Sequence, residues 1–184
     1  MTSVALGLIA AASSTGAWCA AVGMEDLGIV AADELGVGLD HLVLVPRPGK
    51  RFPTVVAALL DGCDVVLAAA PRLSPGERRR LSARARERRA VLVVLGGSRA
   101  APTIAGQPWP DGVDVHFSVT GSSFAGLGSG SGRMSSHRVD VIATRRAAAP
   151  REKHASLWFP SLSAGITGAA LVAAEAAVSS AGVR

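Results

Sequence analysis

The chain has 184 residues, of which 49% are hydrophobic and 18% charged, a balance typical of one globular domain that excludes a disordered chain. The formal net charge is +5, and almost every basic residue is arginine, since Lys50 and Lys153 are the only lysines. Arginine makes bidentate contacts with phosphate and carboxylate groups, so nucleic acid or an acidic protein is a candidate partner; an arginine-rich composition without function is the alternative.

The uncharged segment Met1–Met24 has to be distinguished from a targeting signal. A secretory signal begins with basic residues, and none precedes the apolar run here. Ser13–Gly16 interrupts the run before it reaches the roughly 20 apolar residues of a membrane span. We therefore expect a helix that ends near Ala12, then a turn, in a cytoplasmic protein without a membrane contact. Cys19 and Cys63 are expected to be buried, reduced thiols.

Strands and helices alternate in the first third of the chain. Ala17–Gly23 and Leu39–Val45 are predicted strands, and Leu27–Leu35 is a predicted helix that Gly36 ends. A second helix is predicted over Pro53–Leu60, before the turn that leads into the next strand.

The stretch Cys63–Gly97 predicts a strand–helix–strand unit. Its strands, Asp64–Ala70 and Val91–Leu95, are nearly continuous runs of Val, Leu and Ala, as in strands covered on both faces. Between them Ser74 begins a helix with proline at its first position, and Glu77 completes a capping box. Alternating strands and helices joined by right-handed crossovers predict an α/β fold, with a mostly parallel central sheet and helices on both faces.

The pattern changes in the second half of the chain. Residues 98–110 hold three prolines and are predicted as a loop. Val113–Thr120 and Arg138–Thr144 alternate strictly between apolar and polar residues, and Leu157–Phe159 is predicted as a short closing strand. Alternation is typical of half-exposed antiparallel strands, so we expect an antiparallel hairpin at the edge of the sheet.

A long glycine- and serine-rich loop, Gly121–His137, is predicted to join the two alternating strands. Loops of this length are commonly mobile or functional, and we interpret this one as a partner-binding element. Its candidate contact residues are Phe124, Leu127 and Arg133.

The helix of the central unit, which we call the arginine helix, is the main candidate binding surface. It carries seven arginines, and Arg80, Arg84 and Arg88 recur at four-residue spacing in one row. One interpretation is the solvated outer face of a crossover helix, and the other is a binding surface for an acidic protein or a nucleic-acid backbone. The candidate residues are Arg78, Arg79, Arg80, Arg84, Arg86, Arg88 and Arg89.

The sequence contains no nucleotide-binding motif. A P-loop requires GxxxxGK followed by Ser or Thr, and Gly49–Lys50 lacks the upstream glycine and the hydroxyl residue. The glycines of Gly126–Gly132 do not lie between a strand and a helix, as a dinucleotide loop requires. The histidines are scattered singly and no CxxC occurs, so no metal site is expected. We expect no catalytic residue and no cofactor.

The order of segments resembles the RecA ATPase core. The stretch CAAVGMEDLGIVAADELGVGLDHL is similar to the RecA segment that begins with the strand carrying the catalytic glutamate, and Glu25 matches that glutamate. Asp64–Ala70 resembles the Walker B strand, but Ala69 stands where the magnesium-associated aspartate would be. The resemblance places the nucleotide loop before Met1. It therefore implies a RecA-like domain in which Glu25 and Ala69 are vestigial ATPase positions.

More specifically, residues 1–160 resemble the actinobacterial ImuA-prime family, the RecA-like accessory proteins of a damage-induced mutagenic polymerase assembly. The phrases that carry this resemblance are GAWCAAVGMEDLG, AADELGVGLDHLVLVPRPG, VVAALLDGCDVVLAA, RRRLSARARERRAVLVVLG and SLWFP. The family implies a non-catalytic scaffold in translesion DNA synthesis under SOS control. It implies two partners, the Y-family polymerase homologue ImuB and an error-prone C-family DNA polymerase.

The expected organisation is a RecA-like domain over residues 1–160 and a tail over residues 161–184 that binds a partner as a helix. RecA-like domains often assemble, so homo-oligomerisation is compatible with the sequence. Two alternatives remain for the function. One is a DNA-binding module that uses the arginine helix, with weak DNA binding, and the other is a degenerate ATPase that acts with a nucleotide loop from elsewhere.

Overall fold

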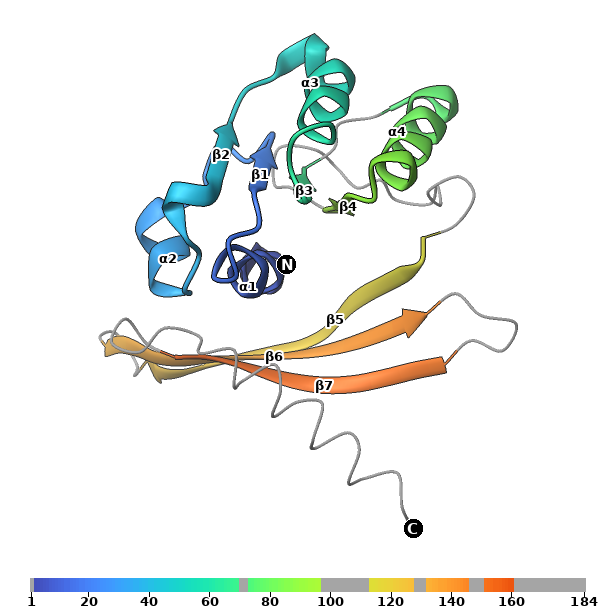
Figure 1. Cartoon of the computed structure of the whole chain (residues 1–184). Helices are drawn as coiled ribbons and strands as arrows, with labels where there is room; N and C mark the ends of the chain where they lie inside the picture. Colours follow the sequence, from blue (N-terminus) through green and yellow to red (C-terminus); the bar gives the residue numbers. More distant parts are fainter. Residues whose placement is uncertain (1, 70–72, 97–112, 128–131, 146–150, 161–184) are drawn as a thin grey trace. The chain divides into compact units, whose positions relative to one another are not determined.

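The computed structural model describes residues 2–69, 73–96, 113–127, 132–145 and 151–160 (Figure 1). The chain divides into two compact units. One consists of residues 1–33 and 37–112, and the other of residues 34–36 and 113–184. The predicted loop over residues 98–110 and the predicted tail over residues 161–184 lie outside the described residues.

The first unit is built on a four-stranded parallel sheet. Its strands are β1 (Cys19–Val22), β2 (Leu42–Val45), β3 (Val65–Ala68) and β4 (Val91–Val94), in the order β2-β1-β3-β4. β1 pairs with both of its neighbours in parallel, and β3 pairs with β4 in parallel. The predicted α/β fold with a parallel central sheet is confirmed.

Helices cover both faces of this sheet. α1 (Thr2–Ser13) packs on β1 and β3, and α3 (Phe52–Leu59) and α4 (Pro75–Arg88) lie on the opposite face (Figure 1). α2 (Ile29–Glu34) is shorter than the predicted helix over Leu27–Leu35. Two 3₁₀ turns, η1 (Leu39–His41) and η2 (Gly49–Arg51), precede β2 and α3; the predicted strand over Leu39–Val45 therefore begins only at Leu42.

The core of this unit lies between the sheet and the α3–α4 layer. All four residues of β1 are buried, as are Val66, Leu67 and Ala68 of β3, which explains their unbroken apolar sequences. One core cluster joins the sheet to this layer, and its members are Ala20, Val22, Phe52, Val56, Leu60, Val66, Ala68, Leu81 and Ala85. Cys19 is buried and Cys63 half-buried, both as free thiols, and burial raises the pKa of Cys19 to about 11.

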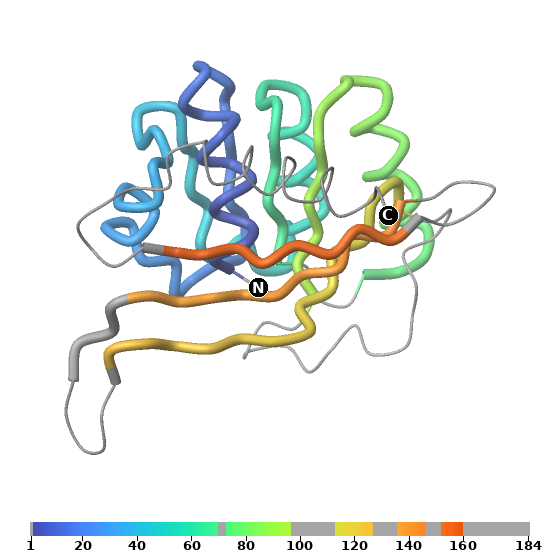
Figure 2. The backbone as a smooth tube through the Cα atoms, turned by 90° about the horizontal axis from the view of Figure 1, so that it is seen from below, coloured from blue at the N-terminus to red at the C-terminus, as the bar shows by residue number. Residues whose placement is uncertain are grey.

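The second unit contains a three-stranded antiparallel sheet. Its strands are β5 (Val115–Leu127), β6 (Gly132–Arg145) and β7 (Arg151–Pro160), in the order β5-β6-β7; Figure 2 shows them side by side. The predicted antiparallel strands are present, but they form a sheet of their own and not a hairpin at the edge of the parallel sheet.

The prediction of a long loop over Gly121–His137 is wrong, because most of this segment continues strands β5 and β6. Its residues pair across the two strands, Ser122 beside Val139 and Phe124 beside His137. Main-chain pairing does not require large side chains, so a glycine- and serine-rich sequence extends the ladder. The register shifts next to Gly121 and Gly126, and Gly126 has a φ of +86°, as expected of glycine in a β-bulge.

Among the described residues, no helix has both the length and the apolar character needed to cross a membrane.

Candidate functional site

The arginine helix, α4, begins at the capping box that the sequence predicts. The Ser74 hydroxyl accepts a hydrogen bond from the Glu77 N–H at 3.3 Å, and the Glu77 carboxylate accepts one from the Ser74 N–H at 2.7 Å. The Ser74 hydrogen bonds lower the pKa of Glu77. The two side chains accept hydrogen bonds from main-chain N–H groups at the start of the helix. The capping box therefore fixes where the helix begins.

The seven arginines of this helix do not form one surface. Arg78 is only 6% exposed and lies on the same face as the buried residues Leu81 and Ala85. Its position therefore contributes to packing, and it is not available as the surface contact that the sequence predicted. The long apolar part of an arginine side chain allows such burial beside alkyl groups.

Arg84 and Arg88 face the end of α3, where both contact Asp61. Arg84 makes a bidentate interaction with this carboxylate at 2.7 and 2.8 Å, and Nε of Arg88 lies 3.1 Å from it. Arg84 also contacts Glu87 at 3.1 Å. These acidic partners offset the charge of two of the three arginines in the predicted row. The sequence does not indicate this role of Asp61, because its pairing with Arg84 spans 23 residues.

We expect Asp61→Asn to reduce the free energy of unfolding near pH 7 and to have a smaller effect at about pH 2. The hydrogen bond from Arg84 lowers the pKa of Asp61 below its usual value of about 4. A depressed carboxyl pKa stabilises the fold above the unfolded pKa, and this contribution is lost as the pH falls through the folded pKa. Urea unfolding at the two pH values measures the effect.

Asp33→Asn on α2 is the matched control, because Asp33 is exposed and makes no ion pair within the described parts of the chain. Its effect should be small and the same at both pH values. An effect of Asp61→Asn that did not vary with pH would show that the ion pairs contribute nothing to stability.

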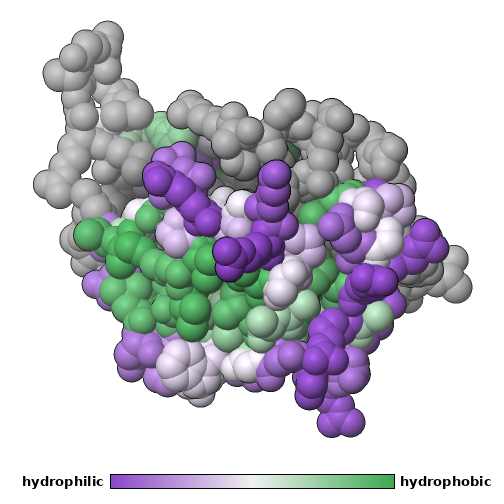
Figure 3. All heavy atoms as spheres, turned by 90° about the horizontal axis from the view of Figure 1, so that it is seen from above, coloured by the Kyte–Doolittle hydropathy of each residue, from purple (hydrophilic) through white to green (hydrophobic). Residues whose placement is uncertain are grey.

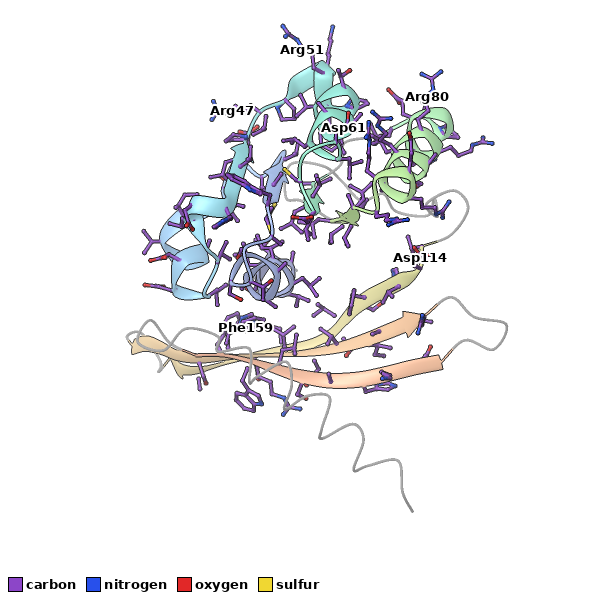
Figure 4. All side chains as sticks on the ribbon, viewed as in Figure 1. Arg47, Arg51, Asp61, Arg80, Asp114 and Phe159 are labelled. Carbon is purple, nitrogen blue, oxygen red and sulfur yellow. The ribbon has the colours of Figure 1, made fainter. Side chains whose placement is uncertain are left out.

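The remaining arginines of the helix project into solvent. Four arginines, Arg79, Arg80, Arg86 and Arg89, are exposed, and none of them makes an ion pair with another described residue. Nε of Arg79 donates a long hydrogen bond of 3.4 Å to the Pro75 carbonyl oxygen. Figure 4 shows Arg80 extending from α4, and Figure 3 shows hydrophilic side chains standing out beside a hydrophobic band on this side.

The second group of predicted contact residues lies in the antiparallel sheet. Phe124 is 53% exposed and its ring stacks on His137, with centroids 4.2 Å apart. Leu127 is the last residue of β5 and pairs with Gly132, and Arg133 follows in β6. The two predicted groups therefore belong to different units, and each is described within its own unit.

A polar cluster on the same sheet was missed in the sequence. Arg138 donates to Asp140 at 3.0 Å and to Ser156 at 3.1 Å, and its guanidinium lies 5.7 Å from the ring centre of the half-exposed Trp158. The hydrogen bond from Ser156, followed by Arg138, lowers the pKa of Asp140. Register alone brings these residues together, since Arg138 pairs with Trp158 and Asp140 with Ser156.

The second candidate site is the carboxyl end of the parallel sheet, where Glu25 and Ala69 lie. Glu25 follows β1 and accepts a 2.9 Å hydrogen bond from Nε of Arg47, with both side chains largely exposed. Ala69 follows β3 and carries no metal-binding group. No set of three His, Cys, Asp or Glu side chains within the described residues is arranged to hold a metal ion.

Main-chain atoms lie close together at the point of this edge at which α/β proteins commonly bind ligands. β1 leads to β2 on one side and β3 leads to β4 on the other, so the adjacent ends of β1 and β3 form the topological switch point. Gly23 lies there with a φ of +75°, and a methyl group on it would be 2.8 Å from the Ala69 carbonyl oxygen. The same methyl would lie 3.4 Å from the buried ring of Phe52.

Comparison with known proteins covers the half of the chain that contains both candidate sites of the first unit. Residues 1–101 match the model of the MT3502 N-terminal domain. The uncharacterized protein Rv3395c of Mycobacterium tuberculosis is 35% identical over 97 residues, which are 52% of this chain and 48% of that protein. The chain thus spans about half the length of this relative. Phe124, Leu127 and Arg133 lie outside the stretch matched by the family model.

Proposed function

This chain belongs to the MT3502 N-terminal domain family, and from that premise and the ImuA-prime resemblance of residues 1–160 we propose that it is a non-catalytic accessory protein of translesion DNA synthesis. It binds the Y-family polymerase homologue ImuB and an error-prone C-family DNA polymerase in the mutagenic complex of the SOS response. The arginine helix and the segment 161–184 are the proposed contact surfaces.

The observation that carries this proposal is the chemistry of the carboxyl edge of the parallel sheet. Phosphoryl transfer requires cations that stabilise charge on the transferred group and a residue that orients the nucleophile. At this edge Glu25 is paired with Arg47, and Ala69 takes the position of the metal-associated aspartate in the RecA resemblance. Gly23 packs directly against the Ala69 carbonyl oxygen. The residues support a retained fold without the groups that act on a triphosphate.

Binding of the purified full chain to immobilised ImuB tests the proposal. We expect direct binding, and at least a tenfold loss of affinity when residues 161–184 are removed, because the tail is a proposed contact. A chain that binds neither polymerase would contradict the proposal. ATP turnover that disappears in Glu25→Gln would contradict it independently, since it would assign catalysis to the position that we consider vestigial.

DNA binding is the second candidate function, and the exposed Arg79, Arg80 and Arg86 favour it. Replacement of phosphate counterions by arginines makes affinity fall with salt, with a slope of about −0.9 per phosphate contact on duplex DNA. A titration of DNA affinity against salt separates the two functions. A slope of several units favours the DNA-binding module, whereas the absence of binding at low salt excludes it.

A further inference from the structure

The β4 strand is the last strand of the parallel sheet in the part of the chain that the structure describes. The N–H groups of Val91 and Leu95 bond to carbonyl oxygens of the β3 segment, at 2.7 and 2.9 Å. Because a strand alternates the direction of its main-chain groups, the N–H and C=O groups of Leu92 and Val94 point to the other side, away from β3. Such an edge can accept one more strand.

One flank of the arginine helix lies along this edge. Arg84 and Arg88 mark the flank that faces α3, because both contact Asp61 at its end. At 3.6 residues per turn, Arg79 and Arg86 lie within about 20° of one another and about 140° or more from Arg84 around the helix. α3 covers β1 and β3 and α4 contacts β4, so Arg79 and Arg86 lie on the side of β4 that is free of α3.

A third arginine adds to the positive charge of this edge. Arg89 ends the helix in a left-handed conformation with a φ of 57°, is exposed, and lies two residues before β4 begins. Arg79, Arg86 and Arg89, which we call the outer arginines, make no ion pair within the described residues. A second copy of this chain paired edge to edge would bring two such sets together, which like-charge repulsion opposes.

We propose that the β4 edge binds an acidic, extended segment of a partner protein, which adds a strand to the sheet while its carboxylates contact the outer arginines. Main-chain hydrogen bonds supply affinity in this mode of recognition, and side-chain charge supplies selectivity. The inference rests on the proposed function in one respect, namely that the arginine helix is a protein-binding surface. It identifies which arginines act and in which conformation the partner binds.

Fluorescence anisotropy with the full chain and a fluorescent peptide of about ten residues, alternating Glu and Val, tests this inference. We expect micromolar binding, and at least a tenfold weaker affinity when alternate amides of the peptide are N-methylated, since these retain the charge but cannot donate hydrogen bonds. Arg79→Glu with Arg86→Glu should weaken the unmodified peptide at least tenfold. Arg51→Glu with Arg80→Glu makes an equal charge change at arginines that are not among the outer arginines, and it should weaken binding of the unmodified peptide less than about threefold.

Each of the other outcomes overturns the inference. Equal binding of the two peptides reduces the site to charge attraction without strand addition. If the two double variants weaken peptide binding equally, the outer arginines are not part of the site. If a single-stranded oligonucleotide binds more tightly than the peptide and the binding depends on Arg79 and Arg86, these arginines bind nucleic acid instead. The assay contains no polymerase, so peptide binding without polymerase binding contradicts only the proposed function. Polymerase binding without peptide binding contradicts only this inference.

Discussion

Phe52→Ala should lower the free energy of unfolding by about 3–5 kcal/mol, toward the upper end of that range. Phe52 is 2% exposed and is the largest fully buried side chain among the described residues. Its neighbours in the core cluster include Ala20, Val22 and Val56, which have short side chains and cannot move far into the space that the ring leaves. An unfilled cavity costs more than the transfer of the lost atoms alone.

Urea unfolding monitored by circular dichroism measures this effect as a change in the midpoint at unchanged slope. Val30→Ala on α2 is the control, because Val30 is 71% exposed and its truncation should change stability by less than about 0.5 kcal/mol. A cost of about 1 kcal/mol or less for Phe52→Ala would show that this core collapses around the missing ring. The arginine helix, α4, would then be packed less tightly against α3 and the sheet than the buried ring suggests.

The parallel sheet could be predicted from the sequence because its signals are local. The Ser74–Glu77 capping box marks the start of α4, as the structure confirms. Continuous apolar runs indicate burial on both faces, which is correct for β1 and largely for β3 but wrong for β4, where no residue is buried and Val91 is 55% exposed. The antiparallel strands could be predicted only in part. The segment from Gly121 to His137 is mostly glycine and serine and has few large apolar residues, so its pairing with neighbouring strands leaves no alternating pattern in the sequence.

The candidate site was predictable in composition but not in arrangement. Helical spacing predicts which arginines share a row, but the pairing of Arg84 and Arg88 with Asp61 depends on how α3 and α4 pack. The burial of Arg78 likewise depends on which face of the helix meets the sheet. Only the packed structure therefore distinguishes arginines that stabilise the fold from those that remain available to a partner.

The same distinction applies at the carboxyl edge of the sheet. In the sequence, Glu25 and Ala69 are positions defined by a resemblance, with one acid retained and the other lost. The structure adds the contact between Gly23 and the Ala69 carbonyl oxygen, which no spacing of residues could indicate. A glycine with a positive φ at a strand end is compatible with a phosphate-binding turn as well as with close main-chain packing, and the short distance to the Ala69 carbonyl oxygen favours the second.

Gly23→Ala is the direct test of that packing, and we expect it to cost at least about 2 kcal/mol of stability. A side chain at a φ of +75° is strained by about 1–3 kcal/mol in general, and here its methyl would also meet the Ala69 carbonyl oxygen at 2.8 Å. The strand ends would have to separate, which disturbs the hydrogen bonds from Gly23 N–H to Val45 and from Ala69 N–H to Val22, both 2.9 Å long.

Two glycine controls separate the causes of that cost. Gly16 has a φ of +88° with no atom within 4 Å of the added methyl, so Gly16→Ala measures the backbone strain alone. Gly62 has neither a positive φ nor a near neighbour, so Gly62→Ala should be neutral or slightly stabilising. The excess of Gly23→Ala over Gly16→Ala measures how tightly β1 and β3 meet at the switch point. If the two substitutions cost the same, the ends of β1 and β3 can separate without loss of stability. A ligand bound between these strand ends would then better explain why an acidic residue, Glu25, lies there.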